Sequence, residues 1–221
     1  MNEMHRRNVL KMAAVFGAMG AFSPIKLALA QSPLRRTPDQ ILGPFYRVGR
    51  TPDLAGDLTH VLGRSGRAAG QLLNVMGRVL NIKGEPLRGA RVEVWQANTH
   101  GRYTHPADGN PAPLDPSFEG FAVMRSDAEG RYRFKTIKPG AYPAGPTTVR
   151  PPHIHFRLSG EHDELVTQMY FEGEPLNEQD RFLQSVSPAA RALLVARLLP
   201  APAEFEPDSR LVVFDIVTLR G

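Results

Sequence analysis

Short runs of alternating apolar and polar residues, separated by turns rich in glycine and proline, restrict the fold of this chain most. Residues 90–97 and 131–137 alternate in the way that a strand with one buried face does. The 221 residues include 20 glycines and 20 prolines, a content that favours many turns over long helices. The pattern therefore predicts an all-β protein.

Seven segments fit strands by their apolar content and flanking turns: residues 71–80, 90–97, 121–126, 131–137, 153–158, 165–171 and 211–219. Short strands with regular turns predict an antiparallel β-sandwich. We also expect one short helix in the C-terminal region. Ser187 can cap it, Pro188 suits its first position, and residues 189–199 are rich in Ala, Leu and Arg.

The first thirty residues predict an export signal. Arg6 and Arg7 precede an apolar run at residues 12–22, and residues 28–30 (Ala-Leu-Ala) offer small side chains before a cleavage point. The paired arginines resemble a twin-arginine signal, which predicts a periplasmic protein of a bacterium. Because a bilayer-spanning helix needs about 20 apolar residues, we expect no stable membrane span.

The rest of the chain divides into an N-terminal arm, residues 31–70, and one sandwich domain, residues 71–221. Phe45 and Tyr46 in the arm either pack across the sandwich or approach a functional site or a neighbouring subunit. The residues alone leave both open. A long loop at 100–119 carries four prolines, and a loop of this length is usually functional or disordered.

Charge and cysteine content exclude several classes of function. The formal net charge is +5, but residues 1–30 carry +3 of it and the remainder only +2. No long run of Lys or Arg is left, so we expect no nucleic-acid partner. The absence of cysteine excludes disulfides, thiolate metal sites and cysteine nucleophiles.

Two histidines, His153 and His155, lie two positions apart in an apolar segment, residues 150–156. Side chains at i and i+2 of a strand point to the same face, so both imidazoles can reach one point. A protein-bound metal usually has three or four protein ligands. The pair is therefore half of a candidate metal site, or simply two histidines on a β-face.

Two tyrosines in turns, Tyr103 and Tyr142, are further candidate ligands. A phenol has a pKa near 10, so it binds a metal as phenolate only beside a hard Lewis acid such as Fe(III). Residue types and spacing support no more than a candidate metal site here. Taken by itself, each tyrosine is more often an ordinary turn or core aromatic than a ligand.

Six motifs together resemble the intradiol ring-cleavage dioxygenases, and especially the β-subunit-like part of the protocatechuate 3,4-dioxygenase branch. They occupy residues 92–98, 101–103, 115–116, 138–143, 150–156 and 167–173. The resemblance runs from about Leu42 to the C-terminus. It implies a β-sandwich that holds one non-haem Fe(III) through four side chains: Tyr103, Tyr142, His153 and His155.

The resemblance also implies the reaction and the other site residues. Arg150 and Gln168 would line the substrate site. Tyr142 would leave the metal as substrate binds, and either Tyr142 or a bound hydroxide would take up a proton. A catechol-type aromatic and O2 would be converted to a cis,cis-muconate without an organic cofactor. Members of the branch pair different chains, so a homo- or hetero-oligomer is expected.

One departure from the family pattern concerns the substrate pocket. The family's Tyr-Pro is commonly followed by a tryptophan that lies against the substrate ring, whereas Ala144 and Gly145 stand here. Two alternatives follow: an exported iron-binding member with altered substrate or lost activity, and a non-catalytic β-sandwich binding module. Such modules lack the strand with His153 and His155, which discriminates against them.

Overall fold

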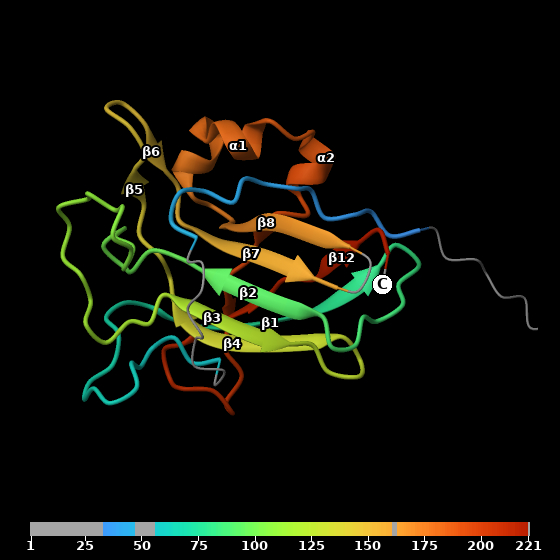
Figure 1. The fold of residues 1–221 in the computed structure, drawn as a ribbon, viewed down its shortest axis with the longest axis horizontal. Helices are drawn as coiled ribbons and strands as arrows, with labels where there is room; N and C mark the ends of the chain where they lie inside the picture. The colour runs from blue at the N-terminus through green and yellow to red at the C-terminus, as the bar shows by residue number, and fades with distance from the viewer. Residues whose placement is uncertain (1–32, 47–55, 161–162, 221) are drawn as a thin grey trace, which may run out of the picture. The chain divides into compact units, whose positions relative to one another are not determined.

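Two five-stranded sheets pack face to face in the computed structural model, which describes residues 33–46, 56–160 and 163–220 (Figure 1). These residues belong to one unit, Ser32–Gly221. One sheet has the order β10-β11-β1-β12, with β4 paired to β1. Its strands are β1 (Leu72–Asn81), β4 (Arg131–Ile137), β10 (Leu199–Pro200), β11 (Arg210–Val213) and β12 (Ile216–Thr218).

The second sheet has the order β3-β2-β7-β8-β9 and carries the site. Its strands are β3 (Phe121–Arg125), β2 (Arg91–Trp95), β7 (His153–Ser159), β8 (Glu164–Phe171) and β9 (Val195–Ala196). The remaining elements are the hairpin β5 (Tyr142–Pro143) and β6 (Val149–Arg150), the 3-10 helix η1 (Pro175–Gln179), and the helices α1 (Arg181–Gln184) and α2 (Pro188–Arg191).

The core lies between the two sheets, and the two-residue period of β7 separates it from the site. Ile154, Phe156 and Leu158 are buried in the cluster that joins both sheets. The ring of Phe156 lies 6.0 Å from that of Phe134 and 5.1 Å from that of Phe214. Burying a side chain of this size contributes about 1.5–3 kcal/mol. Because neighbouring residues point oppositely, the histidines of β7 are directed to the other face of the sheet.

The predicted β-sandwich is confirmed, but its sheets are mixed rather than purely antiparallel. β1 pairs in parallel with β11 and β12, and β8 pairs in parallel with β9. The strand expected at 211–219 is divided at Phe214, whose N–H donates to Met76 O, and Asp215, whose carboxylate accepts from Arg78 N. Alternation specifies which face is buried, whereas strand direction depends on the path of the chain.

The helix expected at residues 189–199 is wrong in its extent. Only Pro188–Arg191 is helical, and it accompanies the separate turn of α1. Leu194 is fully buried with Tyr170 and Leu183, and Val195 pairs with the edge of β8. Burial and strand pairing outweigh the helix propensity of an Ala- and Leu-rich run, which is a weak preference.

The first described part of the arm, residues 33–46, runs alongside β8, where Figure 1 draws it in blue. Thr37 N donates to Val217 O at 2.9 Å, and Gln40 N donates to Val166 O at 2.8 Å. The helices α1 and α2 lie beyond β8 in the same view. Within the part of the chain that the structure describes, every helix is too short or too polar to cross a membrane. The predicted export signal lies outside the described residues.

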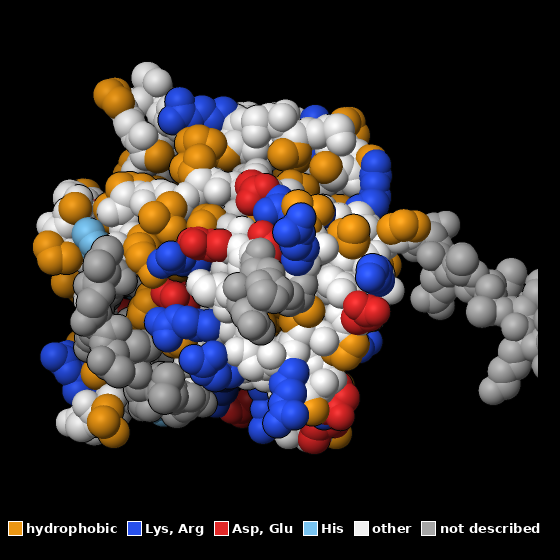
Figure 2. Space-filling model, turned by 45° about the vertical axis from the view of Figure 1, so that its right-hand side comes forward, with side chains coloured by type: hydrophobic (Ala, Val, Ile, Leu, Met, Phe, Trp, Pro, Cys, Tyr) orange, Lys and Arg blue, Asp and Glu red, His pale blue; other side chains and the backbone are white. Residues whose placement is uncertain are grey.

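Charged side chains of both signs lie next to one another on the face that Figure 2 shows. On the outer face of the second sheet, Arg91 pairs with Glu93 at 2.8 Å and Arg157 pairs with Glu164 at 2.7 Å. The Arg157–Glu164 pair is solvent-exposed and contributes little to stability, about 0–1 kcal/mol, whereas the Glu93 side chain is only 4% exposed.

Candidate metal centre and substrate pocket

The two histidines of β7 lie side by side on the outer face of the second sheet. His155 is opposite Trp95 of β2 and Gln168 of β8, and His153 is opposite Tyr170. The indole of Trp95 stacks on the imidazole of His155 with ring centroids 4.8 Å apart and an interplanar angle of 9°. The Nε2 atoms of the two histidines are 3.1 Å apart. The strand and its neighbours therefore hold both imidazoles at one point.

Tyr103 is placed by the loop after β2, which side-chain hydrogen bonds shape. The Asp108 carboxylate accepts from Tyr103 N at 2.7 Å, and Asn110 Nδ2 donates to Gly101 O at 2.9 Å. Tyr142 begins β5 in the neighbouring hairpin. Gly101 has φ +75°, and a Cβ there would lie 2.0 Å from Ala141 O. Glycine at this position lets the two loops that carry the tyrosines approach closely.

The four candidate ligands form a closed circuit of rings. Centroid distances are 5.4 Å from Tyr103 to Tyr142, 5.6 Å from Tyr142 to His153, 4.7 Å from His153 to His155, and 6.4 Å from His155 to Tyr103. All four side chains are buried. Three separate segments, a loop, a hairpin and a strand, thus bring together the residues that the sequence singled out.

The protonation states of His153 and His155 suit metal binding through their ring nitrogens. Burial lowers the pKa of His153 and of His155 well below the ordinary value, and nearby Arg150 lowers both further. Both imidazoles are therefore neutral at neutral pH. His153 Nδ1 lies 2.7 Å from Pro151 O, which can only accept, so Nδ1 carries the proton and Nε2 offers its lone pair.

Burial also raises the pKa of Tyr103 well above its ordinary value and raises the pKa of Tyr142, so both phenols are protonated in the metal-free protein. The Tyr103 hydroxyl, Trp95 Nε1 and His155 Nδ1 are buried without a hydrogen-bond partner among the described residues. Buried polar atoms without a partner are costly, and a metal ion bound by the Tyr103 oxygen would remove that cost for Tyr103.

The donor set fits ferric iron. In the described ranges no group of three or more His, Cys, Asp or Glu side chains could hold a metal ion, so an ion here depends on the phenols. Two phenolates and two imidazoles form an anionic, hard set that suits Fe(III). The converging Nε2 atoms and the unpartnered Tyr103 hydroxyl are the structural observations behind this fit.

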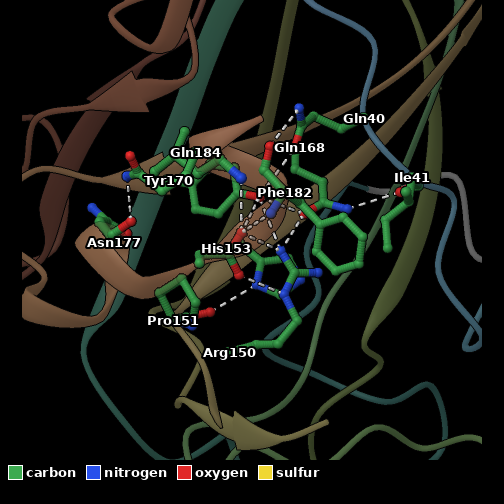
Figure 3. Close-up of polar contacts among 12 residues, drawn as sticks. Gln40, Ile41, Arg150, Pro151, His153, Gln168, Tyr170, Asn177, Phe182 and Gln184 are labelled. Atoms are coloured by element: carbon green, nitrogen blue, oxygen red, sulfur yellow. Dashed lines mark hydrogen bonds and ion pairs between the residues drawn. The ribbon is translucent and has the colours of Figure 1, made fainter. Parts of the chain in front are cut away.

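Arg150 stands beside this centre in a buried polar network (Figure 3). Its Nε donates to the Asp180 carboxylate at 2.8 Å, and its Nη2 donates to Gln168 Oε1 and to Tyr170 OH, both at 2.9 Å. Burial alone lowers the pKa of Arg150, but Asp180 and nearby tyrosines raise it above the ordinary value. Gln168 in turn donates to Ile41 O at 2.8 Å. Arg150 is therefore a fixed, charged group.

A half-open pocket of about 550 Å³ leads to Tyr142 and Arg150. Its wall includes Ile41, Pro44 and Phe45 of the arm, Asp108–Pro111 of the loop after β2, Tyr142–Ala144, Arg150, and Arg181 and Phe182 of α1. Tyr142 is the one of the four candidate ligands that lines it. Gln168 does not line the pocket, but it contacts the pocket residue Arg150 by accepting from its Nη2 at 2.9 Å. The long loop at 100–119, for which the sequence left a functional and a disordered state open, contributes residues 108–111 to the wall.

The arm covers the site, which answers the question left open for Phe45 and Tyr46. The Phe45 ring lies 4.6 Å from that of Tyr103, and the Tyr46 ring lies 4.9 Å from that of Trp95. Tyr46 OH donates to the Glu93 carboxylate at 2.8 Å. Both aromatic residues therefore pack against the candidate centre.

Sequence reasoning missed three contributors: Asp180, Phe182, and Gly43 of the arm, where an added Cβ would lie 3.1 Å from His155 Cε1. Asp180 binds Arg150 from 30 positions away and also accepts from Phe182 N and Leu183 N at the start of α1. No local pattern reveals such a partner. An aspartate that begins a helical turn is itself a common sequence signal, but only for capping.

Comparisons with known proteins point to the same chemistry. The sequence profile of a family described as "Dioxygenase" matches residues 41–221. The chain is 52% identical over 147 residues to the protocatechuate 3,4-dioxygenase beta chain of Burkholderia cepacia, a match that covers 65% of this chain and 62% of that protein. It is 36% identical over 121 residues to a catechol 1,2-dioxygenase of Acinetobacter baylyi, covering 46% and 36% respectively.

Among solved structures, the dioxygenase domain of a dioxygenase and carbohydrate-binding fusion protein from Streptomyces sp. SirexAA-E superposes with a TM-score of 0.62 at 28% identity. The superposition covers 83% of this chain and 98% of that one. This chain spans less than two thirds of the length of the two curated relatives that it matches.

Proposed function

The chain belongs to the intradiol dioxygenase family, on its protocatechuate 3,4-dioxygenase beta-chain-like branch, and we propose on that premise that it is a non-haem Fe(III) enzyme. The proposed reaction cleaves the ring of a catechol between its two hydroxylated carbons. Both atoms of O2 enter the product, a cis,cis-muconate, so no external reductant is needed. Membership of this family argues against a non-catalytic binding module.

One observation carries the proposal: the closed circuit of Tyr103, Tyr142, His153 and His155 around a single point. These four side chains would hold the iron. Bound there, ferric iron would supply the Lewis acidity that draws protons from the catechol oxygens and activates the ring toward O2. A catalytic metal site keeps one position that substrate or water can reach, as catalytic zinc sites do.

Tyr142 is suited to provide that position because it alone of the four lines the pocket. A catechol entering there would reach Tyr142, and the oxygen of this side chain, deprotonated when it holds the iron, could accept a substrate proton. Arg150 lines the same pocket and stays cationic at every relevant pH, so it can stabilise negative charge that develops on the ring. Asp180, Gln168 and Tyr170 hold its guanidinium in place.

Metal analysis and colour test the centre. The purified protein is expected to contain one iron per chain and to be red, because phenolate-to-Fe(III) charge transfer absorbs visible light. His153→Ala and His155→Ala should each lose the iron. Full iron retention in both variants would exclude this ligand set.

Oxygen uptake tests the reaction. Wild-type protein should consume O2 with a catechol and give a product whose mass is that of the substrate plus two oxygen atoms, cleaved within the diol. A red, iron-loaded protein that consumes no O2 with any catechol would favour the alternative, an iron-binding family member that has lost the activity.

We also propose export through the twin-arginine route to the periplasm of a bacterium. The support is the order of a basic segment, a short apolar run and Ala28-Leu29-Ala30 in the sequence. Replacing Arg6 and Arg7 together by lysine should leave uncleaved precursor in the cytoplasm. Unchanged export of this double variant would point to another pathway.

Assembly into a homo- or hetero-oligomer is the last part of the proposal. It is supported by the relative in Burkholderia cepacia, which is described as a beta chain. Light scattering on the purified protein should give a mass that is a multiple of one chain. A single species at the mass of one chain, with full activity, would contradict this part.

A further inference from the structure

The phenyl ring of Phe182 contacts two arginines of the pocket, one buried and one exposed. The guanidinium carbon of Arg150 lies 4.6 Å from the ring centroid, and that of Arg181 also lies 4.6 Å from it. Arg150 is only 3% exposed, whereas Arg181 is exposed at the surface. Both are cation–π contacts, and both residues line the pocket that leads to Tyr142.

The two cations differ in their partners. Arg150 is paired with the Asp180 carboxylate and bonded to Gln168 and Tyr170, so its charge is already balanced. Arg181 makes no ion pair with any residue that the structure describes. An incoming anionic group would therefore find its free counter-charge at Arg181 and not at Arg150.

Another part of the pocket wall carries the opposite charge. Asp108, Gly109 and Asn110 line it, and the Asp108 carboxylate accepts from the backbone N–H groups of Tyr103 and Asn110. A carboxylate on the ligand would be repelled there and attracted toward α1. Charge on the two walls thus gives a ligand one preferred orientation.

The pocket is also larger than one ring requires. Its volume of about 550 Å³ lies within the range of pockets for drug-sized ligands, about 300–1,000 Å³. Ala144 lines this space with only a methyl group beside Pro143. A ligand that contacts Tyr142 and the exposed Arg181 can rest on the Phe182 ring, which Arg181 contacts at 4.6 Å.

We propose that Arg181 and Phe182 form a subsite for the substituent of an extended catechol, whose arm packs on the Phe182 ring and ends in a carboxylate paired with Arg181. The inference rests on the proposed function and identifies its substrate class. The planar guanidinium can hold a carboxylate through two parallel hydrogen bonds, which favours this group over a neutral one.

The test compares acids with their isosteric neutral amides. Dihydrocaffeate and its primary amide represent a catechol with an extended arm, and protocatechuate and its amide carry the group directly on the ring. Oxygen uptake gives kcat/KM for each compound with wild type, Arg181→Gln and the control Arg210→Gln. Arg210 begins β11 in the other sheet, so its replacement removes the same charge away from the pocket.

Wild type should prefer dihydrocaffeate over its amide, and Arg181→Gln should reduce that ratio about tenfold, the loss expected for one charge-assisted pair. The protocatechuate ratio should change much less, and Arg210→Gln should leave both ratios as in wild type. An unchanged dihydrocaffeate ratio in Arg181→Gln overturns the subsite. A change confined to protocatechuate overturns the extended arm.

Binding of dihydrocaffeate and of its amide, measured by calorimetry in the absence of oxygen, tests the subsite independently of the reaction. If neither compound is oxidised but Arg181→Gln still removes the preference for the acid, the subsite stands and the proposed reaction fails. If both are cleaved with equal preference in all variants, the reaction stands and the subsite fails. Absence of binding by either compound also overturns the subsite.

Discussion

At the scale of single residues, burial decides how much a charge matters. Arg150 and Asp180 are each 3% exposed in their side chains, whereas Arg157 and Glu164 are 30% and 56% exposed at similar separation. Removing one partner of a buried pair leaves an uncompensated charge away from water, and removing one partner of an exposed pair does not.

Asp180→Asn therefore should lower the free energy of unfolding by about 3–5 kcal/mol. Asparagine keeps an acceptor for the N–H groups of Phe182 and Leu183 but removes the charge that balances Arg150. The matched control, Glu164→Gln, should cost less than about 1 kcal/mol. Urea denaturation measures both. Equal losses in the two variants would mean that Asp180 does not hold a buried cation.

At the scale of elements, the arm acts as part of the site. Gly43 has φ +75°, and a Cβ at this position would lie 3.1 Å from His155 Cε1. His155 cannot easily yield, because its ring is stacked on Trp95. A Cβ at position 43 therefore requires either the arm or His155 to shift by a few tenths of an ångström.

Gly43→Ala should lower both stability and iron content. The left-handed backbone alone costs about 1 kcal/mol for a residue with a Cβ. The control is Gly63→Ala, which carries the same backbone cost at φ +77° but has no atom within 4 Å of the added Cβ. Iron per chain after equal exposure to metal should fall in Gly43→Ala only. Equal iron content in the two variants would separate the arm from the centre.

At the scale of the whole molecule, the centre links segments that are far apart in the chain. Tyr103 follows β2, Tyr142 begins β5, and both histidines belong to β7. The unfolded chain does not hold these four side chains together. Iron that binds only the folded form stabilises the whole fold in proportion to its affinity and concentration.

Removing iron with a chelator under reducing conditions should therefore lower the Tm of wild type. Free metal at a hundred times its dissociation constant contributes about 2.7 kcal/mol, which corresponds to roughly 5–10 °C for a chain of this size. The Tm of His155→Ala should not respond to the same treatment. A response equal to that of wild type would mean that the stabilising metal is bound elsewhere.

The sequence by itself determined which residues face the core and which can meet. Alternation over residues 131–137 and 153–158 requires no distant information, because the two-residue period follows from backbone geometry. The same period places His153 and His155 on one face. The motifs around Tyr103 and Tyr142 then suggested the other two candidate ligands, although only through resemblance to a family.

The tertiary structure alone decided strand direction, helix length and the surroundings of the candidate ligands. Parallel pairing of β1 with β11 and β12 depends on where the chain returns, and Leu194 leaves a helix-prone run because its burial is worth more than propensity. Asp180 reaches Arg150, and the arm reaches His155, across distances along the chain that no local pattern spans. Contacts of this kind arise from packing, which local sequence does not encode.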